Sequence, residues 1–134
     1  MNMNCRLSDA ITRIKNAKRN DYPCVKVLWS QKNFAVLSVL KENGIAVDRL
    51  EVVSLDKEGK KLIEPELMVH LRRGKLHALK VLSTPGRIMH VNKKKIPVYK
   101  NHLGLIVIST SSGMMTGAEA TEKGIGGKLM VSAF

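Results

Sequence analysis

The sequence predicts an α+β protein built from two small, closely packed α/β subdomains, residues 1–72 and 73–134. Two patterns lead to this class. Apolar residues near the start recur at the spacing of an amphipathic helix, whereas later stretches alternate like half-buried strands. Size is the third observation, because 134 residues with 44% hydrophobic content can bury a core. The expected order is α-β-α-β-β in the first subdomain and mostly β with one short helix in the second.

An amphipathic helix is expected at the start of the first subdomain. Leu7, Ile11 and Ile14 fall at positions i, i+4 and i+7, which places them on one face of a helix. Ser8 or Asp9 can cap it, because both side chains accept hydrogen bonds from backbone N–H groups. On pattern alone, the opposite face is best explained as an ordinary solvated surface. The residues on that outward face are Thr12, Arg13, Lys15, Asn16 and Arg19.

A short strand and a second helix are expected next. Residues 24–28 form a β-rich run, and Ser30 then marks the cap of a helix that extends to Asn43 and is stopped by Gly44. Apolar residues cover a wide arc of this helix, so most of it is expected to lie in the core. The side chains expected to be buried are Phe34, Val36, Leu37, Val39 and Leu40.

Two strands complete the first subdomain. Residues 45–55 and 67–71 have strand patterns and are joined by a polar hairpin region. In the later strand, Leu67, Val69 and Leu71 occupy alternate positions. This alternation predicts that one face of the strand lies in the core and the other in water.

A further strand, residues 77–82, leads into a turn that carries an arginine. Pro85 and Gly86 mark the turn, and Arg87 follows them. An arginine on a rigid turn can direct two donors at one phosphate, although an ordinary surface arginine explains the pattern equally well. The three lysines of residues 93–95 come next, and such a run usually marks a solvated loop.

The C-terminal stretch combines an apolar strand, residues 103–108, with four consecutive hydroxyl residues, 109–112, and a short helix. Thr116 and Glu119 have the spacing of a capping box, and Gly124 follows as a stop. Ser and Thr side chains both donate and accept hydrogen bonds, so a row of them on a rigid frame suits a sugar-phosphate backbone or base edges. On the loop alone, a turn that satisfies its own backbone is the favoured interpretation.

The distribution of charge decides between these interpretations. The chain carries 23 Lys and Arg against 11 Asp and Glu, a net charge of +12. Residues 1–66 contain 12 bases and 9 acids, whereas residues 67–134 contain 11 bases and 2 acids, with no acid between Leu67 and Ala118. A basic surface kept only for solubility normally mixes both signs. The pattern therefore indicates a polyanionic partner.

The scarcity of aromatic residues indicates which polyanion fits. Two Phe, two Tyr and one Trp cannot form a wide platform on which single-stranded bases stack. Structured RNA, recognised by its shape and its backbone, fits this composition better.

Other classes of function have little support. The chain contains no P-loop, nucleophile-elbow, zinc-protease or dinucleotide-binding motif. The basic half offers no carboxylate for a general base except Glu119 and Glu122. An enzyme that binds a phosphosugar through residues 109–113 is the catalytic alternative. Cys5 and Cys24 lack the spacing of a disulfide framework or a zinc site, so a reducing compartment is expected, with no metal and no cofactor. No apolar segment is long enough to span a membrane.

Several motifs resemble, in order and spacing, those of the small-subunit ribosomal protein S8 family. The most specific is ISTSSGMMT, residues 108–116, and two others are the helix signatures TRIKNA at 12–17 and VLKENG at 39–44. The resemblance covers essentially the whole chain. The remaining matches are residues 83–87, residues 101–104 and the pair Gly126 and Gly127.

This resemblance implies a two-part α/β protein without catalytic activity. It would be a structural constituent of the small ribosomal subunit that binds the central domain of the small-subunit RNA and helps its assembly. Its expected partners are that RNA and neighbouring small-subunit proteins, with no membrane, and some bacterial members also bind their own messenger RNA. The expected location is the ribosome, in the bacterial cytoplasm or in an organelle. A free-standing RNA-binding regulator is the other alternative.

The resemblance also implies roles for individual residues. The hydroxyl residues after the C-terminal strand would read the RNA, the outward face of the first helix would contact its backbone, and the arginine of the Pro-Gly turn would hold a phosphate. The charge argument adds one residue of the lysine run. The predicted RNA-binding residues are Thr12, Lys15, Asn16, Arg87, Lys94, Ser109, Thr110, Ser111 and Gly113.

Overall fold

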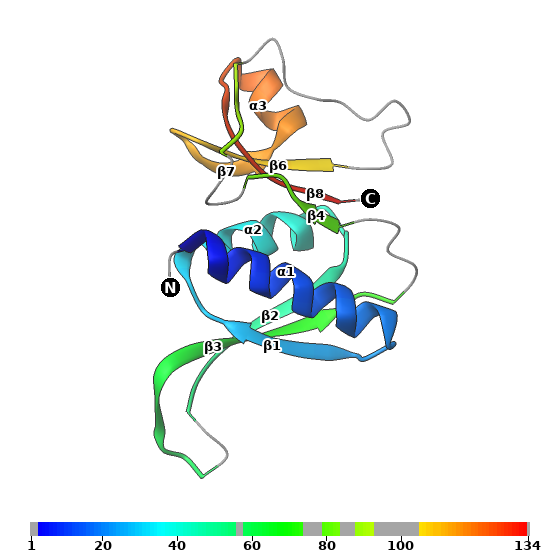
Figure 1. Cartoon of the computed structure of the whole chain (residues 1–134), viewed down its shortest axis with the longest axis vertical. Coiled ribbons are helices and arrows are strands. Elements are labelled where there is room, and N and C mark those ends of the chain that lie inside the picture. Colours follow the sequence, from blue (N-terminus) through cyan, green and yellow to red (C-terminus); the bar gives the residue numbers. More distant parts are fainter. Residues whose placement is uncertain (1–2, 56–57, 74–78, 84–87, 93–104, 134) are drawn as a thin grey trace. The chain divides into compact units, whose positions relative to one another are not determined.

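A computed structural model describes residues 3–55, 58–73, 79–83, 88–92 and 105–133. The chain divides into two compact units, unit 1 from Met1 to Lys75 and unit 2 from Leu76 to Phe134. The described residues form three helices and two antiparallel sheets, as Figure 1 shows. The predicted α+β class is therefore confirmed.

Unit 1 contains two helices and a three-stranded sheet. In chain order, its elements are α1 (Met3–Arg19), β1 (Cys24–Leu28), α2 (Gln31–Glu42), β2 (Val47–Leu55) and β3 (Lys61–Leu71). The strand order in the sheet is β1-β3-β2, and both pairings are antiparallel. The order α-β-α-β-β is the one that the sequence predicts for the first half of the chain.

The core of unit 1 lies between the two helices and one face of this sheet. Figure 1 shows α1 and α2 on the same side of the strands. The predicted stripe of α1 is buried, because Leu7, Ile11 and Ile14 are all at most 2% exposed. Leu67 and Val69 of β3 have no exposed surface, which confirms the alternation predicted for that strand. Burial of these side chains is the main stabilising contribution in a unit of this size.

The start of α1 differs from the prediction. The helix begins at Met3, so Ser8 and Asp9 lie inside it and are not its cap. Both engage residues one turn later: the Ser8 carbonyl accepts a hydrogen bond from Thr12 Oγ1 at 2.9 Å, and Asp9 forms an ion pair with Arg13 at 2.9 Å. The Asp9–Arg13 side-chain pair at i and i+4 supports the helix interior, so an aspartate with good capping chemistry can occur there.

The caps of α2 are confirmed, but one of its predicted core residues is wrong. Ser30 caps the N-terminus by accepting a hydrogen bond from the Asn33 N–H at 3.0 Å. Phe34 is 41% exposed, whereas Asn33 is fully buried. The buried face includes positions 33, 36, 37 and 40, and Phe34 lies off that stripe. Asn33 can be buried because its Nδ2 donates to the carbonyls of Arg6 and Leu28.

In the β2–β3 hairpin of unit 1, strand β3 is longer than the sequence predicts. β3 begins at Lys61, where it pairs with Leu55, whereas the strand predicted from the sequence alternation begins only at Leu67. Ladder hydrogen bonds define this additional length, and a burial pattern cannot reveal them. β2 starts two residues after the predicted position, because Ala46 takes a left-handed conformation with φ of 63° before the strand.

Unit 2 is mostly β with one short helix, as predicted. Its elements are β4 (Leu79–Val81), β5 (His90–Val91), β6 (Leu105–Thr110), β7 (Gly113–Thr116), α3 (Gly117–Lys123) and β8 (Gly127–Ala133). The strands follow the order β4-β8-β6-β7, and β5 pairs with β8. The two-residue strand β5 was not predicted. Of the strand predicted at residues 77–82, residues 77 and 78 lie outside the described part of the chain.

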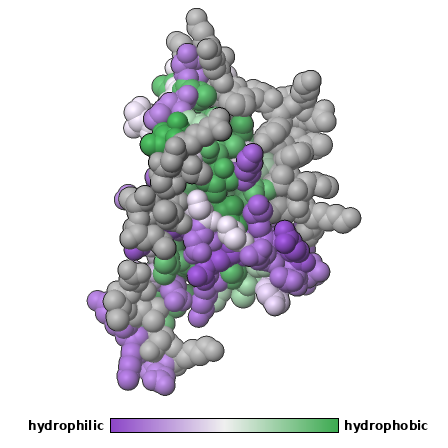
Figure 2. Space-filling model, in the orientation of Figure 1, coloured by the Kyte–Doolittle hydropathy of each residue, from purple (hydrophilic) through white to green (hydrophobic). Residues whose placement is uncertain are grey.

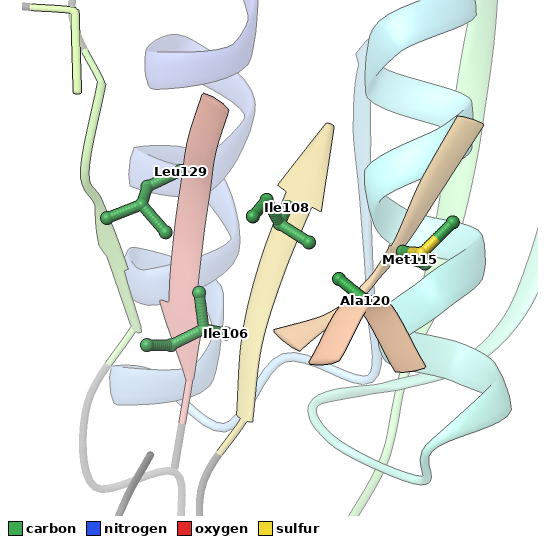
Figure 3. Packing of buried hydrophobic residues seen from close by; sticks show 5 residues of the cluster. All are labelled: Ile106, Ile108, Met115, Ala120 and Leu129. Atoms are coloured by element: carbon green, nitrogen blue, oxygen red, sulfur yellow. The ribbon is translucent and has the colours of Figure 1, made fainter. Parts of the chain in front are cut away.

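A buried apolar cluster lies between α3 and the sheet of unit 2. Figure 3 shows its five side chains, Ile106, Ile108, Met115, Ala120 and Leu129, all at most 6% exposed. Both predicted ends of the helix are confirmed. Thr116 Oγ1 accepts a hydrogen bond from the Glu119 N–H at 3.2 Å, and Gly124 takes the left-handed conformation with φ of 70°.

Candidate nucleic-acid interface

The hydroxyl row of unit 2 lies at the end of the β6–β7 hairpin. The sequence predicts a loop after the strand, but Ser109 and Thr110 continue β6, Ser111 and Ser112 form the turn, and Gly113 begins β7. Ladder pairing continues to the turn, with Thr110 opposite Gly113. The hydroxyls are thus carried by a tight hairpin whose backbone is fixed by the sheet.

The Thr110 hydroxyl stabilises the turn itself. Its Oγ1 donates to the Gly113 carbonyl at 2.8 Å and accepts a hydrogen bond from the Ser112 N–H at 3.1 Å. For this residue the self-satisfied turn, which was the favoured interpretation of the loop alone, is the observed arrangement. Gly113 completes the turn with a φ of 110°, a conformation that L side chains rarely adopt. Thr110 and Gly113 therefore position the hairpin tip.

The neighbouring serines are differently placed. Ser111 and Ser112 are exposed, and Ser109 is half-buried. Within the described residues, the side-chain hydroxyls of these three serines make no hydrogen bond. Each retains one donor and two acceptor positions for an external partner. The turn thus presents free hydroxyls on a backbone that cannot easily move.

Two glycines where β8 begins lie against the backbone of neighbouring strands, Gly127 against the hairpin and Gly126, one residue before β8, against β5. A Cβ added to Gly127 would lie 2.1 Å from the Ser109 carbonyl oxygen, and one added to Gly126 would lie 2.3 Å from the Val91 carbonyl oxygen. Neither position can accept any side chain without displacing backbone. The sequence contained a signal for this contact, the double glycine, but only the structure shows which strands it holds together.

Lys128 is a candidate contact residue that the prediction missed. It is the β8 partner of Ser109, and it also pairs with His90 of β5. Residues paired across an antiparallel ladder lie on the same face of the sheet, so the Lys128 side chain leaves the sheet on the face of the Ser109 hydroxyl. Ile108 and Leu129, one position away, occupy the opposite, buried face. A cation therefore accompanies the hydroxyl row.

The second group of predicted contact residues lies on the outward face of α1. Thr12, Lys15 and Asn16 are all exposed, and positions i, i+3 and i+4 lie together on one side of a helix. Figure 2 shows hydrophilic side chains gathered over this helix. Thr12 Oγ1 donates to the Ser8 carbonyl, whereas the Lys15 ammonium has no bonding partner in the described part of the chain.

Arg13, the next basic residue on this helix, is less available. Its Nε contacts Asp9 Oδ2 at 2.9 Å, and one terminal nitrogen lies 3.4 Å from the Lys26 carbonyl oxygen. An exposed ion pair of this kind is worth little in stability but cancels one positive charge locally. Lys15 is therefore more available to a polyanion than Arg13. The predicted contacts Arg87 and Lys94 lie outside the described residues.

Comparison with known proteins decides the family. The family model described as "Ribosomal protein S8" matches residues 6–134, which include both the α1 face and the hairpin. The chain belongs to the ribosomal protein S8 family. The family resemblance inferred from the motifs is thus confirmed.

Relatives within the S8 family match the chain over nearly its whole length. The small ribosomal subunit protein uS8 of Borrelia garinii subsp. bavariensis is 35% identical over 129 residues, 96% of each chain. That of Neisseria meningitidis serogroup C is 33% identical over 130 residues, 97% of each chain. The protein named small ribosomal subunit protein uS8c of Phaeodactylum tricornutum is 34% identical over 128 residues, again 96% of each chain.

Three further observations concern metal binding, membrane insertion and the described cysteine. In the described ranges, no group of three or more His, Cys, Asp or Glu side chains is arranged to hold a metal ion. None of the helices among those residues combines the length and apolar character needed to cross a membrane. The thiol of Cys24 is free.

Proposed function

We propose that this chain is a structural protein of the small ribosomal subunit that binds the central domain of the small-subunit RNA and helps it to assemble. Membership of the S8 family supports the ribosomal role. The observation that carries the RNA-binding part is the hairpin tip, where the hydroxyls of Ser109, Ser111 and Ser112 have no partner among the described residues and the backbone is positioned by Thr110 and Gly127. The proposed location is the ribosome, and neighbouring small-subunit proteins are proposed as further partners.

Affinity and discrimination come from different groups in this proposal. Lysines and arginines contact phosphates, so they supply most of the binding free energy and make it fall steeply with salt. Lys15 and Lys128 belong to this class, and Arg87 and Lys94 are proposed to join them. The serine hydroxyls, which carry no charge, add contacts whose strength depends on the geometry of the RNA. Thr12 and Asn16 supply polar contacts to the backbone beside Lys15.

Catalysis is not part of this proposal. A phosphosugar enzyme that used the hairpin would need a group to accept or deliver a proton. The chain has no carboxylate from residue 67 to residue 118. The nearest one in sequence, Glu119, is exposed on α3. The arrangement suits binding by hydrogen bonds and charge, without bond breaking.

The decisive experiment compares binding to two RNAs. One is a transcript of the central domain of small-subunit RNA, and the other is an unrelated duplex of equal length. We expect tighter binding to the central domain at 150 mM salt and co-sedimentation of the protein with small subunits. Equal affinity for both RNAs would contradict the proposal. Specific binding without co-sedimentation would instead favour the free-standing regulator.

A further inference from the structure

A groove of about 510 Å³ opens in unit 1, where the end of α1 meets the end of β3. Lys18, Asp21 and Tyr22 line it from the end of α1 and the following turn, and Leu71, Arg72 and Arg73 line it from the end of β3. Figure 1 shows these chain segments together at one edge of the unit, and the pairing of Cys24 with His70 explains why they meet. The volume is in the range of small-ligand sites.

The backbone around the groove is well fixed. The Tyr22 N–H donates to the Ala17 carbonyl at 2.9 Å, and Asp21 takes a left-handed conformation with φ of 57° to make this turn. On the other wall, the Leu71 N–H donates to the Pro23 carbonyl at 2.9 Å. The Lys18 ammonium joins the walls by donating to the Arg72 carbonyl at 2.6 Å. The groove is therefore a formed feature of the fold.

Tyr22 is the unusual member of this groove. Its side chain is 60% exposed, the largest exposure among the exposed large hydrophobic residues of the described chain. A tyrosine that remains in water keeps its apolar ring faces available for stacking and its hydroxyl for hydrogen bonding. Because it lines a groove, a planar group that stacks on it would also contact the other wall.

The charges of the groove favour a phosphate. Arg72 and Arg73 are exposed and adjacent in sequence. The Arg72 guanidinium lies close to Gly44, just after the end of α2. Its Cζ would be 3.6 Å from a Cβ added to that glycine. Guanidinium groups match phosphate oxygens with paired donors. Asp21 is the single carboxylate in the lining and can accept a hydrogen bond from an amino group.

From this combination we infer that the groove binds one unpaired nucleotide of an RNA, with its base on the Tyr22 ring and its phosphate on Arg72 and Arg73. An acidic peptide would satisfy the arginines, but its carboxylates would be repelled by Asp21 and it would not use the ring. A nucleotide supplies all three partners: a flat face, an anion and base N–H donors. The inference rests on the proposed function in so far as it takes the partner to be RNA.

A single-base site also agrees with the composition. The few aromatic residues exclude a long stacking surface, but one ring suffices for one base, and each stacked base contributes substantially to affinity. The RNA recognised by such a protein would combine a paired region with at least one base turned out of its helix. The groove thus extends recognition beyond hydroxyl and phosphate contacts.

The test is an NMR titration of the full chain labelled at its two tyrosines, Tyr22 and Tyr99, with adenosine monophosphate as the probe. The Tyr22→Phe variant assigns the signals and keeps a ring for stacking. We expect adenosine monophosphate to shift the Tyr22 ring signals upfield, and ribose 5-phosphate, which lacks the base, to leave the ring unstacked. Tyr22→Leu should weaken binding about tenfold, measured by backbone shifts around Arg73, while Tyr22→Phe keeps it.

Matched variants separate the phosphate contact from general charge. Arg73→Gln should weaken adenosine monophosphate several-fold and reduce its salt dependence, whereas Arg49→Gln, which removes an exposed arginine of β2 outside the groove, should change neither. Triglutamate should compete poorly.

Three results would overturn the inference: Tyr22 signals that stay fixed at millimolar adenosine monophosphate, a Tyr22→Leu variant that binds it as tightly as the original chain, or tighter binding of triglutamate. Binding of central-domain RNA is measured separately. If the chain fails to bind central-domain RNA but still binds adenosine monophosphate, the proposed function is contradicted and the nucleotide inference is not.

Discussion

In the proposed function, the hairpin of unit 2 and the α1 face of unit 1 would contact a polyanion in different ways. The hairpin presents neutral hydroxyls, at Ser111 and Ser112, on a backbone held by a turn hydrogen bond and by close contact with Gly127, where no side chain fits. The α1 face presents Lys15 on a long flexible stem. A charge on a flexible stem attracts any phosphate, whereas fixed hydroxyls form hydrogen bonds only with a surface of matching geometry. Discrimination should therefore depend on the hairpin, and general attraction on the helix.

The outer face of the unit 1 sheet provides an internal control for this comparison. It carries charges of both signs in contact: Arg49 lies 3.1 Å from Glu51, and Lys26 lies 4.0 Å from Glu66. The His70 ring lies 3.4 Å from the Glu51 carboxylate. Paired in this way, the cations have little net field to offer a phosphate. Variants on this face should leave RNA binding unchanged, although the face is exposed.

The largest effect is expected from Gly127→Ala, which tests whether a fixed backbone is the basis of the hairpin's role. The new methyl group would overlap the Ser109 carbonyl, so we expect a loss of about 1–3 kcal/mol in the free energy of unfolding. Affinity for central-domain RNA should fall by more than for any single serine variant. Urea unfolding and filter binding measure the two quantities. A variant with unchanged stability and affinity would refute the holding role of Gly127.

Ser111→Ala tests discrimination directly. Removing this exposed hydroxyl should weaken binding to the central-domain transcript by about 1–3 kcal/mol, since its partner in the complex is left unsatisfied, and should barely change binding to an unrelated duplex. Ser54→Ala, at an exposed serine of β2, is the matched control and should affect neither RNA. If Ser111→Ala weakens both RNAs equally, the hydroxyl contributes affinity without discrimination.

The two helix caps test whether stability and binding can be separated. Thr116→Ala in unit 2 and Ser30→Ala in unit 1 each remove one cap hydrogen bond, so each should lower the free energy of unfolding by about 1 kcal/mol. Neither hydroxyl is free to contact RNA, and RNA affinity should therefore remain close to that of the original chain. Calorimetric unfolding and filter binding check this pair. A large loss of RNA affinity in either variant would mean that the cap acts beyond its own helix.

Only a small effect is expected from Lys15→Gln. Loss of one phosphate contact should weaken both RNAs evenly and reduce the slope of log affinity against log salt by about 1. Arg13→Gln should do less, because that cation is already paired with Asp9. An unchanged slope would remove Lys15 from the contact set. The same titration checks Arg87 and Lys94, whose roles stay predictions.

Local chemistry explains what the sequence predicted well. The cap of α2 at Ser30, the cap of α3 at Thr116 and the stop at Gly124 depend on residues within one helical turn. The buried stripe of α1 and the alternation of β3 follow from periodicity alone. Asn33 was missed because its burial depends on carbonyls of Arg6 and Leu28, which reach it only in the folded unit.

The parts of the site that were missed depend on register. Lys128 lies on the same face of the sheet as Ser109 because the register of the β6–β8 ladder shifts between Val107 and Ile108. No local sequence pattern predicts this shift. The groove of Tyr22 likewise needs Asp21 in a left-handed turn to bring the end of α1 beside the end of β3. The hydroxyl row was recognised, but the structure divides it into a residue that closes the turn and residues left free.

The contact of Gly127 with the hairpin also restricts how the specificity of the proposed RNA binding could change over time. With no room for a side chain at Gly127, a substitution there would displace the hairpin backbone. Among the described residues, by contrast, the hydroxyls of Ser111 and Ser112 bond to nothing. If the proposed function holds, changes in RNA preference would therefore be tolerated best at these two turn positions, where a new side chain would meet the RNA and leave the fold intact.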